Sequence, residues 1–178
     1  MEITSDAMSL FPYAKQSFFD RLYQLYPRSA YNSTFFQRQQ FFGDFIINCP
    51  TYYMATATAD AGLATYKLVF NAGSQLHGAT GLFIYAPSAE ANNVTLANYM
   101  KDWVISFTTH LDPNAQSYTG QTGKPYWPMY NPALGNANMS TPEFAIMDVN
   151  YTMVGAIPDL DASAQCDFFH ASSYDVRN

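Results

Sequence analysis

The sequence predicts a mixed α/β fold in which helices outnumber strands. Hydrophobic residues make up 48% of the 178-residue chain, which is enough apolar material for a core and excludes intrinsic disorder. Several stretches have apolar residues at helical spacing, and only two short stretches are rich in β-forming residues. Because two isolated strands cannot make a free-standing sheet, we expect this chain to form one end of an α/β domain.

The first helix is predicted from Leu10 to Tyr26. Apolar side chains recur there at helical spacing, and Pro27 ends the segment because proline cannot continue the backbone hydrogen bonding. A second helix is predicted to begin after Ser33, a candidate N-cap, and to end at Ala61-Gly62. Its broad apolar face is expected to consist of Phe35, Phe36, Phe42, Phe45, Ile46, Cys49 and Tyr53.

Two features interrupt the second helix. Gly43-Asp44 and Pro50 lie inside it, which favours a kink or two stacked segments over one straight rod. A short run rich in β-formers follows and predicts a strand over Ala64–Phe70. Asn71–Ser74 contains Asn, Gly and Ser, and this composition predicts a turn directly after the strand.

The second half of the chain contains the clearest amphipathic helix, over Val94–Leu111. Its apolar stripe comprises Leu96, Ala97, Met100, Trp103, Val104, Phe107 and Leu111. A loop rich in Gly, Pro and Asn follows over Asp112–Pro142, and its length suggests a surface segment that wraps around something else. A second strand is expected over Glu143–Val149 and a short helix over Ala162–Phe169.

The charge balance excludes several classes of partner. Lys and Arg total 8 against 14 Asp and Glu, so the net charge is −6 and the pI is near 4.7. A nucleic-acid-binding protein needs a basic surface to neutralise phosphates, and a polybasic membrane patch needs the same residues. The densest apolar stretch, Phe41–Cys49, is shorter than a membrane span and is broken by Gly43-Asp44. We therefore expect no nucleic-acid partner and no membrane span.

The composition is typical of a secreted protein. Charged residues make up only 12% of the chain, while Tyr, Asn and Thr are abundant. Asn-x-Ser/Thr acceptors for N-glycosylation occur at Asn32, Asn93, Asn138 and Asn150. The first residues, Met1–Asp6, have neither a basic start nor an apolar block, so they are not a signal peptide. A secretory composition without a targeting segment suggests a fragment of a longer protein.

The cysteines allow two interpretations. Cys49 and Cys166 are far apart in the sequence, and they are either free buried thiols or one structural disulfide. Neither has a Cys or His nearby at metal-ligand spacing, so we expect no zinc site. The chain also has no glycine-rich nucleotide-binding motif, and no cofactor is expected.

One histidine is placed like a catalytic base. The chain lacks the serine-nucleophile motif G-x-S-x-G and the metalloprotease motif H-E-x-x-H. His110 ends the amphipathic helix, where a capping or surface role is expected, and His170 follows two phenylalanines, where packing is the default. His77 instead lies in a loop just past a strand and precedes Gly78.

Landmarks along nearly the whole chain resemble the C-terminal third of the type-B carboxylesterase/lipase/cholinesterase family. Each landmark is weak alone, but they occur in the family's order. They are Gly43–Pro50, the strand Tyr66–Phe70, His77-Gly78, the helix from Trp103 through Phe107 to Leu111-Asp112-Pro113-Asn114, Tyr126–Tyr130, the strand Glu143–Val149 and Gln165–Phe169.

The resemblance implies that residues 1–178 are a partial α/β-hydrolase domain, with most of the central sheet and the rest of the active site elsewhere. In that family the catalytic triad runs Ser, then Glu or Asp, then His, and His77 matches the triad histidine. It would pass the nucleophile's proton to the leaving alcohol of an ester substrate. The resemblance also implies a disulfide between Cys49 and Cys166 and a secreted full-length protein.

The chain departs from the family pattern in two places. The family commonly carries an acidic residue soon after His-Gly, but here Ala79-Thr80-Gly81 follows His77. Glu2 does not lie in the sequence context of the family's triad acid, and the serine elbow is absent. A histidine without a serine has nothing to activate, so this chain alone should not hydrolyse esters. The alternative is a non-catalytic interaction protein of the same fold, similar to the cholinesterase-like adhesion molecules.

Overall fold

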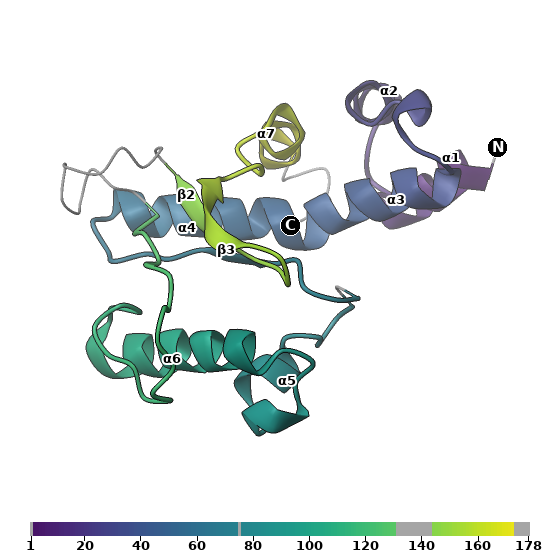
Figure 1. Cartoon of the computed structure of the whole chain (residues 1–178). Coiled ribbons are helices and arrows are strands. Elements are labelled where there is room, and N and C mark those ends of the chain that lie inside the picture. The colour runs from purple at the N-terminus through teal and green to yellow at the C-terminus, as the bar shows by residue number, and fades with distance from the viewer. Residues whose placement is uncertain (1, 75, 131–143, 173–178) are drawn as a thin grey trace. The chain divides into compact units, whose positions relative to one another are not determined.

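The structure, a computed structural model, describes residues 2–74, 76–130 and 144–172 (Figure 1). The chain divides into two compact units. Unit 1 comprises Met1–Met54 and Leu160–Asn178, and unit 2 comprises Ala55–Asp159. Helices dominate, and one small mixed sheet lies in unit 2, which agrees with an α/β class. No helix within the described ranges is both long and apolar enough to cross a membrane.

The chain begins with two helices where one was predicted. Helix α1 spans Glu2–Leu10, and α2 spans Gln16–Leu25. The predicted helix start at Leu10 is wrong: Leu10 is the last residue of α1, which cannot continue through Pro12 because the proline ring would obstruct the preceding turn. The predicted end at Tyr26 is confirmed, since Tyr26 is the C-cap and its amide donates to the Leu22 carbonyl.

A long helical run follows the 3₁₀ turn η1 (Arg28–Ala30), drawn in Figure 1 as α3 and α4. Helix α3 spans Thr34–Gly43, the π-helical segment η2 spans Asp44–Asn48, and α4 spans Cys49–Asp60. Ser33 caps the run as predicted, because its hydroxyl accepts from the Phe36 amide at 3.3 Å. The π-helical segment lies where the kink was predicted. Its hydrogen bonds close wider rings than those of an α-helix. Gly62, with a φ of +77°, ends the run as expected.

The predicted apolar face of α3 is wrong in part. The side chains of Phe35, Phe36 and Ile46 are 65%, 51% and 44% exposed. The face that packs in unit 1 instead runs through Gln37, Phe41, Asp44, Phe45 and Cys49, and the π-helical segment shifts the positions that follow it. Spacing identified a helix here, but the composition is apolar on several sides and did not fix which side would be buried.

The core of unit 1 is aromatic. Helix α7 spans Ala164–Ala171, close to the predicted range, and is capped by Ser163. Phe11 makes edge-to-face contacts with Phe18 and Phe45 at centroid distances of 5.1 and 4.9 Å. The buried members of this core are Ala7, Phe11, Phe18, Phe19, Leu22, Tyr26, Phe41, Cys49, Cys166 and Phe169.

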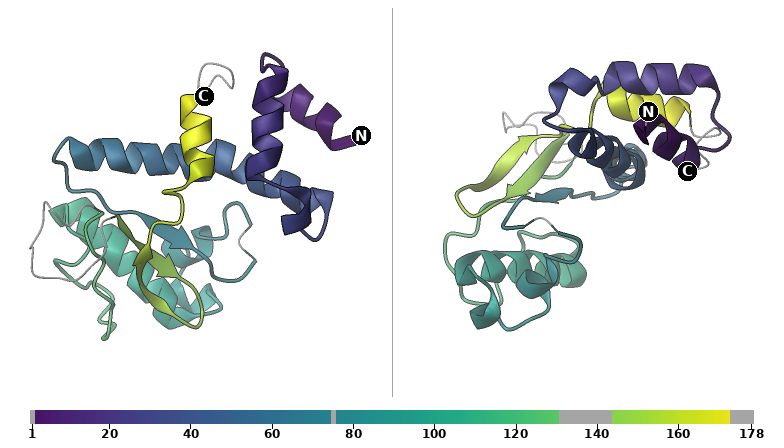
Figure 2. Two further views of the ribbon diagram at one scale, coloured as in Figure 1. Left: turned by 90° about the horizontal axis from the view of Figure 1, so that it is seen from above. Right: turned by 90° about the vertical axis from the view of Figure 1, so that its right-hand side faces the viewer.

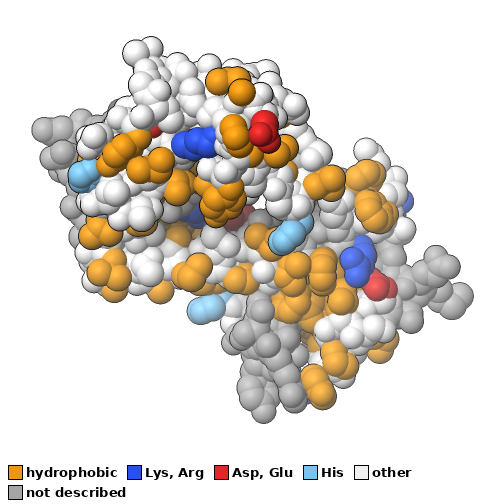
Figure 3. Space-filling model, turned by 90° about the horizontal axis from the view of Figure 1, so that it is seen from below, with side chains coloured by type: hydrophobic (Ala, Val, Ile, Leu, Met, Phe, Trp, Pro, Cys, Tyr) orange, Lys and Arg blue, Asp and Glu red, His pale blue; other side chains and the backbone are white. Residues whose placement is uncertain are grey.

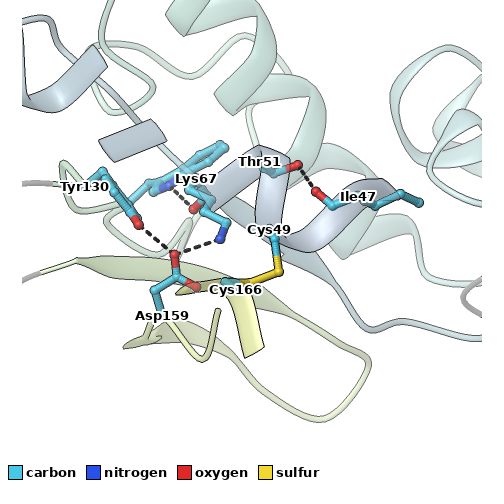
Figure 4. Close-up of polar contacts among 8 residues, drawn as sticks. Ile47, Cys49, Thr51, Lys67, Tyr130, Asp159 and Cys166 are labelled. Atoms are coloured by element: carbon cyan, nitrogen blue, oxygen red, sulfur yellow. Dashed lines mark hydrogen bonds and ion pairs between the residues drawn. A yellow bond between two sulfur atoms is a disulfide. The ribbon is translucent and has the colours of Figure 1, made fainter. Parts of the chain in front are cut away.

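The disulfide between Cys49 and Cys166 joins α4 to α7 within this core (Figure 4). The two Cα atoms are 4.9 Å apart, and both residues are almost fully buried. This pairing confirms what the family resemblance implied and removes the alternative of two free thiols.

Unit 2 is built on a three-stranded sheet in the order β1-β2-β3. Strand β1 (Leu68–Phe70) is parallel to β2 (Ala145–Val149), and β2 is antiparallel to β3 (Val154–Pro158). Figure 2 shows β2 and β3 side by side as a hairpin. Strand β1 is shorter than the predicted Ala64–Phe70, and β3 was not predicted. The short segment V-G-A-I-P contains Gly and Pro, so it gives little strand signal of its own, and its pairing with β2 decides its conformation.

Helix α6 spans Val94–His110 and confirms the clearest helix prediction. The Asn93 side chain caps it by accepting from the Leu96 amide at 3.0 Å, and Leu111 ends it in the left-handed conformation. Its buried residues are Leu96, Ala97, Met100, Asp102, Trp103 and Ser106, and Trp103 is fully enclosed. The predicted stripe is wrong at its C-terminal end, where Val104, Phe107 and Leu111 are 39%, 38% and 68% exposed. Two shorter elements, α5 (Gly81–Ile84) and η3 (Ser88–Glu90), precede this helix.

A buried carboxylate holds the loop after α6. The described part of the predicted long loop, residues 112–130, has no helix or strand. Asp102 of α6 is fully buried and accepts hydrogen bonds from the Tyr118 and Thr119 amides and from the Ser117 and Thr119 hydroxyls, at 2.5–2.8 Å. Burial acts to raise the pKa of Asp102, but these hydrogen bonds outweigh it and lower the pKa.

Replacing Asp102 with alanine is expected to lower the free energy of unfolding by about 3 kcal/mol, because several buried donors lose their acceptor. The folded pKa of Asp102 is below the unfolded one, so its carboxylate stabilises the protein fully above the unfolded pKa of about 3.9. This stabilisation is lost as the pH falls from there through the folded pKa. Urea denaturation of wild type and Asp102→Ala at pH 7 measures the first effect, and denaturation of wild type and Asp102→Asn between pH 7 and pH 2 measures the second.

The asparagine variant keeps the shape of the side chain but does not titrate, so it serves as the matched control. Its unfolding free energy should fall less than that of wild type as the pH drops below about 4. Parallel pH curves for the two proteins would contradict a role for the Asp102 charge.

Candidate functional site

His77 lies in the loop between β1 and α5. The loop leaves the carboxyl end of β1 through Gly73, whose φ is +67°, and His77 is followed by Gly78, whose φ is +84°. These left-handed backbone conformations suit glycine. Gly78 thus adopts a conformation of the kind expected after His77. The amide of Ala79 donates to the Leu76 carbonyl at 2.9 Å, which closes a turn around His77. The imidazole is exposed and open to a reacting group.

No carboxylate of the described residues orients the His77 ring. The ring makes no hydrogen bond to any residue within 2–74, 76–130 or 144–172. A triad histidine needs a carboxylate that fixes its tautomer and a serine that gives it a proton. His77 is therefore accessible as a base, but no described residue takes the role of its carboxylate or of the serine.

The start of the His77 loop is firmly anchored. The Asn71 amide donates to the Val149 carbonyl at 2.8 Å, and its side chain donates to Asp148 Oδ1 at 2.7 Å. Asp148 lies at the end of β2 and is 8% exposed. Its other oxygen accepts from the Asn150 side chain at 3.1 Å. These contacts continue the pairing of β1 and β2 one residue into the loop.

The other two histidines take the expected roles. His110 is the last residue of α6, and its Nε2 lies 3.1 Å from the Tyr118 hydroxyl and 3.2 Å from Gln116 Oε1. His170 of α7 stacks on Tyr53 with ring centroids 4.0 Å apart. The Tyr53 hydroxyl donates to Asp167 Oδ1 at 3.2 Å, and burial together with this contact raises the pKa of Tyr53 to about 12.

A buried ion pair in unit 2 has no counterpart in the sequence prediction (Figure 4). Lys67 Nζ lies 2.7 Å from Asp159 Oδ2, and the same oxygen accepts from the Tyr130 hydroxyl at 2.7 Å. The side chains of Lys67 and Asp159 are 6% and 0% exposed. Lys67 directly precedes β1 and Asp159 follows β3, so the pair joins the two edges of the sheet. The two residues are 92 positions apart, so no local sequence pattern predicted their contact. Its burial marks it as structural, in contrast to His77.

Unit 1 also contains a buried carboxylate, that of Asp44. Asp44 accepts from the Tyr26 hydroxyl at 2.8 Å and from the side chains of Gln40 and Asn48 at 3.0 and 2.8 Å. Burial, and then the hydrogen bond to Asp44, raises the pKa of Tyr26 well above its usual range, so this tyrosine stays a donor. The Asp44 carboxylate, in the π-helical segment, accepts from three donors and therefore has a structural role.

The predicted glycosylation acceptors differ in environment. Asn32 is exposed, Asn93 is half-buried and caps α6, and Asn150 is half-buried in the turn between β2 and β3. Asn138 lies outside the described residues. Their modification stays a prediction.

Apolar side chains are exposed in both units. In unit 1 they include Phe35, Phe36 and Ile47, and in unit 2 they include Leu76, Tyr85 and Leu111. Figure 3 shows hydrophobic side chains spread over one face of the molecule, with few charged side chains among them. No group of three or more His, Cys, Asp or Glu residues in the described ranges is arranged to hold a metal ion.

No family model, curated protein or solved structure matches the chain significantly. The functional argument therefore depends on the residues themselves. Of the polar groups described above, His77 combines a reactive side chain with exposure and an imidazole that no described residue engages.

Proposed function

We propose that this chain is the C-terminal part of a secreted carboxylic ester hydrolase of the type-B family and that it supplies the catalytic base, His77. The observation that carries the proposal is the position of His77, exposed before Gly78 in the loop that follows the carboxyl end of the parallel strand β1. In open α/β sheets, functional groups gather at the carboxyl ends of the strands. The ordered landmarks that resemble the family support the same assignment.

In the proposed reaction, His77 accepts the proton of a serine hydroxyl while the serine oxygen attacks the ester carbonyl. The protonated imidazole then gives that proton to the leaving alcohol, and an acyl-enzyme remains. Water repeats the sequence, with His77 again as base, and releases the carboxylic acid. The serine and the carboxylate that holds the imidazole belong to a part of the protein other than this chain.

The disulfide gives independent support to the resemblance. The family pattern implied a bond between Cys49 and Cys166, and nothing in their spacing favoured that bond over free thiols. The structure contains this bond, which agrees with the pairing that the resemblance implied. It bears on the relationship to the family, whereas the activity depends on His77.

The proposal predicts where a serine-directed probe will react. A fluorophosphonate should label the full-length protein on a serine outside residues 1–178, and labelling should coincide with loss of p-nitrophenyl ester hydrolysis. The 178-residue chain alone should be neither labelled nor active, because a base without a nucleophile does not catalyse acyl transfer. Peptide mapping of the labelled protein identifies the serine.

Other outcomes would reject the proposal in distinct ways. Labelling of a serine within residues 1–178, or His77-dependent hydrolysis by the chain alone, would show that this chain contains a complete site. A folded, secreted full-length protein that is neither labelled nor active would favour the adhesion-like alternative. The Ala79-Thr80-Gly81 segment after His77 is the feature that favours this alternative, because it lacks the acidic residue common in the family.

A further inference from the structure

The turn between β2 and β3 packs against the loop that carries His77. Tyr151 lies in this turn, and a methyl group placed on Gly73 would meet the Tyr151 hydroxyl oxygen at 3.0 Å and two ring carbons at 3.6 Å. Gly73 precedes His77 by four residues. A side chain at this position would therefore be strained by the φ of +67° and would press on the Tyr151 hydroxyl.

Tyr151 also contacts the segment that follows His77. Its ring centroid lies 6.4 Å from that of Phe83, a buried residue of α5. Phe83 in turn packs edge-to-face on Phe70 of β1, at 5.1 Å. The two ends of the His77 loop are therefore held together by Phe70 and Phe83, and Tyr151 lies against both sides of the loop.

The turn that presents Tyr151 is itself fixed. Asn150 Oδ1 accepts from the Thr152 amide and hydroxyl and from the Met153 amide, at 2.8–2.9 Å. The Asn150 side chain also donates to Asp148, which accepts from Asn71 at the start of the His77 loop. The turn and the loop thus share one buried carboxylate.

We infer that Tyr151 is a positioning residue for His77. It does not reach the reacting atoms. It restricts the loop, so that the imidazole meets a serine in one orientation and loses less entropy in the transition state. This inference rests on the proposed function for its catalytic consequence, whereas the restraint on the loop is a property of the folded chain.

Hydrogen exchange in the full-length protein tests the restraint without reference to activity. The Ala79 and Gly81 amides donate to the Leu76 and Gly78 carbonyls at 2.9 Å, so they report on the order of the loop. In Tyr151→Ala these two amides should exchange about tenfold faster, while the amides of α6 should not change. Tyr85→Ala is the matched control, because Tyr85 is 85% exposed and lies at the far end of α5.

Kinetics test the catalytic consequence. Tyr151→Ala should lower kcat by about 10- to 100-fold with little change in KM, and Tyr151→Phe, which keeps the ring, should restore most of the activity. Gly73→Ala should have a similar effect. Gly120→Ala is its control, because Gly120 also has a positive φ, of +74°, but has no atom within 4 Å of the added methyl group.

The outcomes separate the inference from the proposed function. Exchange at the wild-type rate in Tyr151→Ala, or an unprotected loop already in wild type, would overturn the restraint. Faster exchange with unchanged kcat in an active enzyme would overturn the positioning role. Faster exchange in a protein whose wild type is inactive would uphold the restraint and reject the esterase function.

Discussion

Under the proposed function, ester hydrolysis by the full-length protein is expected to fall by about 10⁴-fold when His77 is replaced by alanine, because the nucleophile then loses its base. The free energy of unfolding should change little, since the side chain is exposed and makes no hydrogen bond to a described residue. The measurement is kcat/KM for a p-nitrophenyl ester, together with a urea denaturation curve for each protein.

His110→Ala is the matched control for this prediction. His110 is also exposed, but it ends α6 and is paired with Tyr118 and Gln116. Its replacement should leave kcat/KM within a few-fold of wild type and lower stability slightly, by about 0.5 kcal/mol, through the lost helix-end interaction. Near-normal turnover by His77→Ala in an active enzyme would remove His77 from the catalytic site.

Reduction of the disulfide between Cys49 and Cys166 is expected to destabilise the protein by about 5 kcal/mol. The bond closes a loop with a sequence separation of 117, and in the chain-entropy model such a cross-link removes much of the freedom of the unfolded chain. A typical domain has a net stability of about 5–15 kcal/mol, so this loss is a large fraction of the total. Urea denaturation of oxidised and reduced protein measures it.

Two variants separate the cross-link from the packing of the cysteines. Reduced wild type keeps both sulfur atoms in the core, whereas Cys49→Ala with Cys166→Ala removes them as well. The double variant should be less stable than reduced wild type by about 1–2 kcal/mol, because a buried sulfur is lost from each side. Equal stability of oxidised and reduced protein, or two free thiols in peptide mapping of secreted material, would contradict a structural disulfide.

The exposure of His77 and the burial of Asp102, Lys67 and Asp159 suggest that different residues of unit 2 serve stability and the proposed activity. Asp102, Lys67 and Asp159 are buried, and their hydrogen bonds hold the loop after α6 and the edges of the sheet. His77 is the exposed member of this set of polar residues. Substitutions of the three buried residues should therefore lower stability. Under the proposed function, substitutions of His77 and of the residues that hold its loop should lower activity.

The sequence alone determined the elements whose signals are local. Helix α6 has its cap at Asn93 and its apolar periodicity within one segment, so its range was predicted to within one residue. Ser33 and Gly62 lie next to the helical run that they delimit, and the composition of Asn71–Ser74 predicted the turn after β1. Capping and periodicity involve residues a few positions apart, and neighbours in sequence are also neighbours in space.

Tertiary structure decided most contacts between distant segments. Strand β3 forms because β2 supplies its backbone partners, and α3 buries Phe41 while Phe35 and Phe36 stay exposed because only one of its apolar sides meets the core of unit 1. The pairing of Lys67 with Asp159 and the contact of Tyr151 with Gly73 join residues 92 and 78 positions apart. The energy of these contacts comes from desolvation and close packing, which depend on the three-dimensional surroundings and leave no periodic pattern in the sequence.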